Sequence, residues 1–150
     1  MPRVQDDVLK SHLAHAVVRL FRLVNRACNR ALADLDLSAE QAHLLSMLWT
    51  LGPMTMGALQ RTLALSSATL TGSIDRMEAQ ELVRRVPSPD DKRAWVVEAR
   101  VPPKRRDKIE ATVERAEKRC FSALAADERR ELARLLDKCI VDLERDTQAR

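Results

Sequence analysis

The sequence predicts a mainly α-helical fold with one small β-hairpin, in the α+β class. Apolar residues recur at spacings of three and four along most of the 150 residues, which is the period of an amphipathic helix. Residues 82–98 depart from this pattern, because two short valine-containing runs there flank a turn with two prolines. With 45% hydrophobic residues but only two Phe, two Trp and no Tyr, we expect a single domain over residues 1–150 with an aliphatic core.

The first element is predicted to be a long helix from Val8 to Leu35, within an N-terminal helical segment of about residues 4–35. Its apolar stripe steps by three or four residues throughout: Leu9, Leu13, Val17, Leu20, Val24, Cys28, Ala31 and Leu35. Further apolar residues, among them Val18, Phe21 and Leu23, make this stripe wider than one partner helix needs. We therefore expect a second neighbour, supplied by another subunit.

A second helix is predicted to begin after Ser38 and to run to about residue 51. Ser38 and Gln41 have the spacing of a capping box, in which each side chain accepts a hydrogen bond from the other residue's backbone N–H. Gly52-Pro53 ends the helix, because proline cannot continue it. Its expected core residues are Leu44, Leu45 and Leu48.

Residues 54–99 have the order of a helix-turn-helix followed by a wing. Met54-Thr55 is extended and is expected to pair with the hairpin as a third strand, while Thr55 caps the next helix. After a turn at Ala64–Ser66, Ser66 or Ser67 caps a second helix, whose buried face carries Leu70, Ile74 and Met77. Strand-like runs at residues 82–86 and 94–98 then form the wing around residues 87–93.

The opposite face of that second helix is polar and suits contact with DNA. Short hydroxyl side chains let a helix backbone lie close to a groove and offer donors and acceptors to base edges and phosphates. Basic residues of the hairpin add attraction to phosphates, although on their own they equally fit a solvated face. Together with the helix-turn-helix and the wing, they predict DNA contact by Ser66, Ser67, Thr69, Thr71, Ser73, Arg76, Arg85, Lys92 and Arg93.

The C-terminal part, about residues 101–147, is predicted to form two further helices. The first begins at Pro102-Pro103, where a missing N–H costs nothing, and Asp127 is expected to cap the second. These helices and the segment 4–35 are expected to join two copies into a homodimer. Two recognition helices about 34 Å apart would then address successive major grooves of a pseudo-palindromic, double-stranded operator.

Other function classes find little support in the sequence. No apolar run approaches the roughly 20 residues of a membrane span, and MPRVQDDVLK does not resemble a secretion signal, so we expect a cytoplasmic location. No glycine-rich loop, nucleophile elbow or carboxylate pair indicates an enzyme, and no cofactor, catalytic residue or metal site is predicted. The net charge of +4 favours a polyanionic partner only weakly.

The order of these elements, with LSSATLTGSIDRMEAQELVRR followed by PDDKRAWVVEA, resembles the MarR family of bacterial transcriptional regulators. The resemblance covers nearly the whole chain. It implies a winged helix-turn-helix with long N- and C-terminal dimerisation helices, and a homodimeric repressor that a small aromatic or phenolic effector releases from DNA. It also implies a wing salt bridge between Asp91 and Arg93.

Two further expectations come with the resemblance. The first is an effector pocket formed by His15, Arg19, His43, Met47 and Trp49. The second concerns a departure from the family, which usually has glycine where this chain has Glu81. If the backbone at Glu81 is left-handed, its side chain costs roughly 1 kcal/mol there.

Three alternatives remain open on the sequence. A winged fold also serves as a helical protein-interaction module, because the fold alone does not decide the partner. A metal-responsive regulator would use His12, His15 and His43, but carboxylates and thiolates at suitable spacing are missing. A thiol-responsive regulator would use a cysteine, yet Cys28, Cys120 and Cys139 each lie in an apolar helical pattern that is typical of buried, inert thiols.

Overall fold

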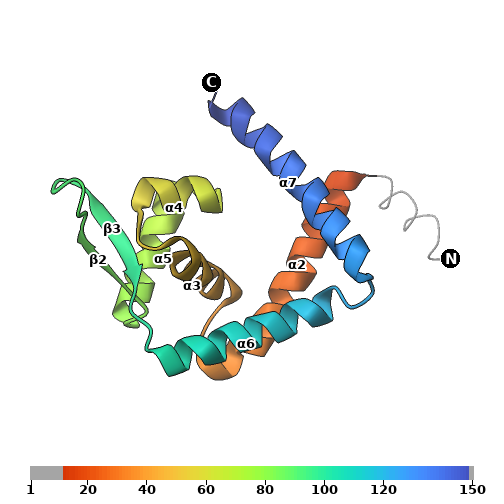
Figure 1. Cartoon of the computed structure of the whole chain (residues 1–150), viewed down its shortest axis with the longest axis horizontal. Coiled ribbons are helices and arrows are strands. Elements are labelled where there is room, and N and C mark those ends of the chain that lie inside the picture. The colour runs from red at the N-terminus through yellow and green to blue at the C-terminus, as the bar shows by residue number, and fades with distance from the viewer. Residues whose placement is uncertain (1–11, 149–150) are drawn as a thin grey trace. The chain divides into compact units, whose positions relative to one another are not determined.

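Helices make up most of residues 12–148, which are the residues that this computed structural model describes. In chain order the elements are α2 (Leu13–Leu32), the 3-10 turn η1 (Ala33–Leu35), α3 (Ala39–Leu51), β1 (Met54–Thr55), α4 (Met56–Leu63), α5 (Ser67–Ala79), β2 (Val83–Pro87), β3 (Trp95–Ala99), α6 (Pro103–Cys120) and α7 (Ala126–Gln148) (Figure 1). The described residues up to Ala116 form one compact unit, and those from Glu117 onwards form a second. The expected fold class, mainly α with a small β wing, is confirmed.

The N-terminal helix is described from Leu13, so the predicted start at Val8 lies outside the described residues. The α-helix ends at Leu32, three residues before the predicted Leu35, because η1 tightens the last turn. Asp36 then adopts a left-handed backbone with φ 53°, and its N–H donates to the Ala33 carbonyl at 3.1 Å. This corner turns the chain from α2 into α3.

Helix α3 begins with the predicted capping box. The Gln41 N–H donates to Ser38 Oγ at 3.1 Å, and the Ser38 N–H donates to Gln41 Oε1 at 3.0 Å. A residue of α2 satisfies a third donor, since the Ala39 N–H donates to Asn29 Oδ1 at 2.7 Å. Four N–H groups at a helix start lack partners within the helix, so these bonds set where α3 begins and tie it to α2.

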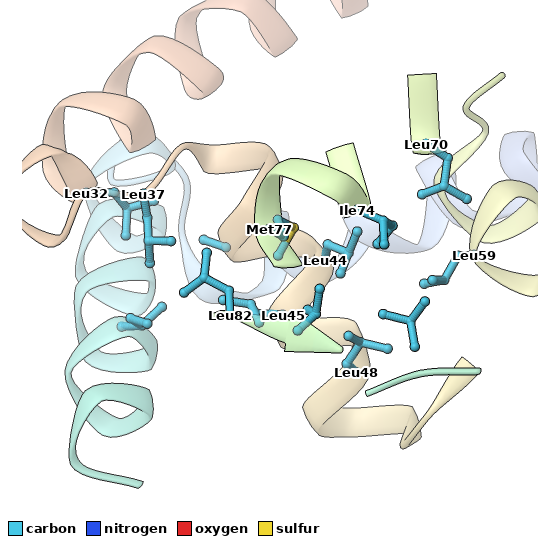
Figure 2. Close-up of a cluster of buried hydrophobic side chains, with 14 residues drawn as sticks. Leu32, Leu37, Leu44, Leu45, Leu48, Leu59, Leu70, Ile74, Met77 and Leu82 are labelled. Carbon is cyan, nitrogen blue, oxygen red and sulfur yellow. The ribbon is translucent and has the colours of Figure 1, made fainter. Parts of the chain in front are cut away.

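An aliphatic core fills the first unit and holds α3, α4, α5 and the sheet together. Figure 2 shows leucines of α3 lying against α5 and the segment after it. The predicted inward residues of α3 and α5 are all buried: Leu44, Leu45, Leu48, Leu70, Ile74 and Met77. Leu59 of α4, Val97 of β3 and Ile109 of α6 belong to the same cluster, which packs the helix-turn-helix against the hairpin.

The three strands form one antiparallel sheet in the order β1-β3-β2. Met54 pairs with Val97 and Arg85 pairs with Val97 from the other side, so β3 lies in the middle. The expected third strand is therefore confirmed. Strands β2 and β3 each begin and end one residue later than predicted, and Pro87 is tolerated because it lies at the end of β2, an edge strand.

Three corners of the first unit place a side-chain-bearing residue where the backbone is left-handed. They are Asp36 after η1, Ala64 after α4 and Glu81 after α5, with φ of 53°, 51° and 57°. At Glu81 the Leu82 N–H donates to the Met77 carbonyl at 2.9 Å, and the Glu81 N–H donates to the Glu78 carbonyl at 3.0 Å. This is the Schellman arrangement, in which glycine is the usual residue at the left-handed position.

Replacing Glu81 by glycine is expected to stabilise the protein by about 1 kcal/mol, because it removes the Cβ penalty of a left-handed residue. For a chain of this size the melting temperature should rise by about 2–4 °C, as measured by circular dichroism at one fixed protein concentration. The matched control is Ala79→Gly, at the last helical residue of α5, which should lower stability because glycine is costly within a helix. Equal effects of both changes would contradict the assignment of strain to Glu81.

At the start of α7, in the second unit, the capping side chain is Glu128 and not the predicted Asp127. The Ala125 N–H donates to Glu128 Oε2 at 2.7 Å, and Asp127 lies within the first turn. The Glu128 carboxylate reaches back three residues to a backbone N–H, as the second residue of a capping box does. Asp127 is only two residues from Ala125 and does not have this spacing.

Within α7, Arg134 lowers the pKa of the exposed Glu131 carboxyl by hydrogen bonding to it at 2.7 and 2.8 Å.

No helix within residues 12–148 is both long enough and apolar enough to cross a lipid bilayer. Of the three cysteines, Cys28 and Cys120 are half-buried but Cys139 is exposed on α7. The expectation of a buried thiol is therefore wrong at Cys139 in the single chain.

Candidate nucleic-acid interface

The polar face of α5 lies exposed as the sequence predicts. Ser66 caps the helix, because its Oγ accepts from the Thr69 N–H at 3.2 Å and lies 2.8 Å from the Thr69 hydroxyl. Ser67, Thr71 and Arg76 are also exposed. The structure thus brings five of the predicted contact residues onto the start and one face of a single helix, where their hydroxyl and guanidinium groups are available to a partner.

Ser73 does not belong to that exposed face. Its side chain is only 4% exposed, and its hydroxyl donates to Glu40 Oε1 of α3 at 2.7 Å. The prediction of direct DNA contact by Ser73 is therefore wrong in this structure. Ser73 lies three residues after Leu70 and four before Met77, so the helical period already places it beside the buried stripe of α5, and the contact with α3 covers it.

Arg85 is likewise engaged within the protein. Its guanidinium pairs with Glu78 and, at 2.7 Å, with Asp75, while its backbone N–H donates to Glu78 Oε1 at 2.8 Å. Both carboxylates come from α5, and only about a quarter of the Arg85 side chain is exposed. The structure shows these contacts in place of the predicted phosphate contact, so Arg85 ties β2 to α5 and fixes the wing beside that helix.

Lys92 and Arg93 lie exposed at the tip of the wing, as expected. Ser88 organises the tip, since its N–H donates to the Ala94 carbonyl at 2.8 Å and its Oγ accepts from the Asp90 N–H at 3.3 Å. These bonds hold the ends of the loop together. The tip therefore presents two cations on a short, hydrogen-bonded loop.

The predicted wing salt bridge between Asp91 and Arg93 is replaced by a different contact. Asp91 Oδ1 accepts from the backbone N–H of Arg93 at 2.9 Å, so the carboxylate orders the loop backbone and not the guanidinium. A carboxylate two residues before an N–H reaches it at little entropic cost. An exposed ion pair would have to immobilise the long arginine side chain, and it would lower the free energy of the folded protein only slightly.

Sequence reasoning missed several residues that shape this surface. Arg61 lies exposed in the last turn of α4, the first helix of the helix-turn-helix, which in such motifs crosses the phosphate backbone. The sequence could have indicated Arg61 as a DNA-contacting residue, because it is the only basic residue between positions 54 and 75. Glu40 and Glu78 had no such signal, since their partners lie on other elements.

The predicted effector residues do not line a groove found on α2 among the described residues. That groove has a volume of about 510 Å³ and is lined by one face of α2: Phe21, Arg22, Asn25, Arg26, Asn29, Arg30 and Ala33. His15, Arg19 and His43 are exposed, while Met47 and Trp49 are half-buried. The Arg106 guanidinium covers the Trp49 ring at 5.1 Å from its centroid. A pocket built from the five residues remains a prediction.

Within residues 12–148, His, Cys, Asp and Glu side chains do not form a group of three or more that would hold a metal ion. The three histidines of the metal alternative therefore do not belong to such a group within these residues.

The chain is similar in sequence and in fold to known transcriptional regulators. Residues 37–95, from the start of α3 to the wing, match the family model described as the MarR family. The regulator MgrA of Staphylococcus aureus, described as an HTH-type transcriptional regulator, is 30% identical over 135 residues, which cover 88% of this chain and 90% of MgrA. Other relatives align over less, and for the MarR protein of Salmonella typhimurium the chain spans 65% of that protein's length.

Solved structures agree on the fold. A cysteine-to-serine mutant of MarR from E. coli in complex with operator DNA superposes with a TM-score of 0.76 at 24% identity, over 91% of this chain and 97% of that one. BpsR of Bordetella bronchiseptica, whose DNA binding is described as regulated by 6-hydroxynicotinic acid, superposes with a TM-score of 0.72 at 24% identity, over 85% and 92% of the two chains.

Proposed function

This chain belongs to the MarR family, a family of transcriptional regulators and not of enzymes, and from that membership we propose that it binds a specific double-stranded DNA operator as a homodimeric repressor. The observation that carries the proposal is the pairing, in one unit, of an exposed polar helix face on α5 with an exposed cationic wing tip. Each feature alone fits a solvated surface. Together, on a helix-turn-helix scaffold, they match the two surfaces that read DNA.

In the proposed complex, α5 enters the major groove and the wing reaches the flanking minor groove. Ser67, Thr69 and Thr71 offer hydroxyl donors and acceptors near the start of α5, where the helix dipole also favours phosphate. Arg76 offers guanidinium donors to guanine or phosphate. Lys92 and Arg93 supply cationic groups to the narrow groove. Arg61 would contact phosphate from α4.

Dimer formation is supported by apolar side chains that each unit leaves exposed. On α2 they are Leu13, Val17, Val18, Leu20, Phe21 and Leu23, and on α7 they are Leu135, Leu136, Ile140, Val141 and Leu143. Runs of exposed apolar residues along a helix are uncommon in monomeric proteins. A second copy would cover them and would provide the second recognition helix that a pseudo-palindromic operator requires.

The proposal extends to a small aromatic or phenolic effector that releases the protein from DNA. It is supported by the family membership and by the small aromatic acid that regulates BpsR. An effector that binds better to a dimer with a different spacing of its recognition helices lowers DNA affinity by shifting the population towards that dimer.

The test is selection of duplexes from a random pool, followed by fluorescence anisotropy with the enriched sequence. We expect a pseudo-palindromic site that binds two chains per duplex. The logarithm of the affinity should fall linearly with the logarithm of the salt concentration, by about 0.9 for each phosphate neutralised. A pool without enrichment, with no salt-dependent binding of any duplex, would refute the proposal and favour a protein-interaction module.

A further inference from the structure

Ser73 lies between two residues of opposite charge on two different helices. Its hydroxyl donates to Glu40 Oε1 in the first turn of α3 at 2.7 Å, and it accepts from Arg76 Nη2 of its own helix at 3.3 Å. A serine hydroxyl has one hydrogen and two lone pairs. Because Glu40 takes the hydrogen, the lone pairs of Ser73 are directed to donors such as the arginine N–H groups.

The guanidinium of Arg76 is thereby held close to its helix but stays accessible. Ser73 is 4% exposed, whereas Arg76 is exposed. Arg76 Nη1 lies 3.4 Å from the position that a Cβ on Gly72 would occupy, so the side chain lies back over the preceding turn of α5. Only one of its nitrogens is used by Ser73, and the other donors remain for a partner.

We propose that Glu40 and Ser73 are positioning residues that fix Arg76 for DNA recognition, although neither would touch the DNA. The inference rests on the proposed function and adds a determinant outside the helix-turn-helix, since Glu40 belongs to α3. A long side chain that is already ordered loses less conformational freedom on binding than a mobile one. Removing the restraint should therefore weaken binding although every DNA-contacting side chain is still present.

The first test replaces Ser73 by alanine and measures the affinity for the selected operator by anisotropy. We expect a loss of about three- to tenfold, the size of effect that ordering one long side chain produces, together with weaker discrimination at the base pair nearest Arg76. Glu40→Ala should behave in the same way. Glu40→Gln keeps an acceptor for the Ser73 hydroxyl and should retain most of the affinity.

The matched control is Gln80→Ala. Gln41 Nε2 donates to Gln80 Oε1 at 2.6 Å, so this side-chain pair joins α3 to the end of α5. Gln80 bonds to Arg76 only through its backbone N–H, which donates to the Arg76 carbonyl at 3.1 Å and which alanine keeps. If the Glu40–Ser73 contact mattered only for packing α3 on α5, both bridges would affect binding equally. We expect Gln80→Ala to leave the affinity within about twofold of the wild type, with thermal melting confirming that both variants are folded.

A double-mutant cycle decides whether the effect passes through Arg76. Arg76→Ala should weaken binding, and adding Ser73→Ala to it should change nothing further. An equal loss from Ser73→Ala in both backgrounds would overturn the proposal, as would an equal loss from Gln80→Ala.

A measurement without DNA separates this inference from the proposed function. In nitrogen-15 NMR of the free protein, the Arg76 Nε–H should be ordered in the wild type and in Gln80→Ala, and mobile in Ser73→Ala and Glu40→Ala. The same mobility in all four proteins would refute the positioning role. If the wild type binds no duplex but Arg76 shows the expected order, the proposed function fails while the restraint itself stands.

Discussion

Replacing both Lys92 and Arg93 by alanine is expected to lower the affinity for the selected operator by about 10- to 100-fold at moderate salt. Both side chains are exposed at the wing tip. Among the described residues, neither the Lys92 ammonium nor the Arg93 guanidinium forms a hydrogen bond or an ion pair. Because two chains bind each duplex, the variant removes four wing cations, and the salt dependence should become shallower by about 3.6 in logarithmic slope if each of them neutralises a phosphate. Anisotropy titrations at several salt concentrations measure both quantities.

The matched control replaces Arg129 and Arg130 of α7, two exposed arginines in the other unit. This variant loses the same two positive charges from the net +4 of the chain but none from the proposed interface. We expect its affinity and salt slope to stay close to those of the wild type, because neither arginine belongs to the surface that is proposed to meet the phosphates. If the two variants lose affinity equally, the wing acts only through the overall charge of the protein.

Local signals predicted most of the fold. The capping box of Ser38 and Gln41 and the caps at Thr55 and Ser66 were all found where the sequence places them. Each depends on residues three positions apart, so the information lies within one turn of chain. The same applies to the buried stripe of α5, because its period reports the face that the helix turns to the core.

The errors at the interface have a common physical origin. Ser73 and Arg85 were assigned to DNA by residue type, yet both have partners elsewhere in the fold. Glu40 lies 33 residues before Ser73, so no local pattern indicates the contact. A polar residue at the edge of a helix face is directed inwards or outwards by its tertiary neighbour, and only the packing of α3 and β2 on α5 supplies that neighbour.

The sequence likewise predicted one left-handed corner, at Glu81, and did not predict another, at Ala64. Glu81 was identified because the family usually has glycine there, and the backbone is indeed left-handed. Ala64 lies in the predicted turn of the helix-turn-helix and has the same left-handed backbone, but its residue type does not indicate this, since alanine favours the right-handed helix. The core against which both corners pack must therefore impose the conformation.

Replacing Leu45 by alanine is expected to lower the free energy of unfolding by about 2–5 kcal/mol. Leu45 lies in the middle of α3, is 0% exposed and belongs to the cluster that joins α3, α5 and the sheet. Its loss removes apolar burial and leaves a cavity that close-packed neighbours fill only in part. Since domains are stable by only about 5–15 kcal/mol, urea denaturation at fixed protein concentration should show a much lower midpoint.

Leu51→Ala provides the control, because it makes the same chemical change at the last residue of the same helix, where Leu51 is 62% exposed. There the change should stay within about 0.5 kcal/mol. The contrast separates burial from helix propensity, which is slightly better for alanine than for leucine at both sites. Equal losses would mean that Leu51 is covered in solution, as it would be by a second copy, and a dependence of its effect on protein concentration would then identify that cover.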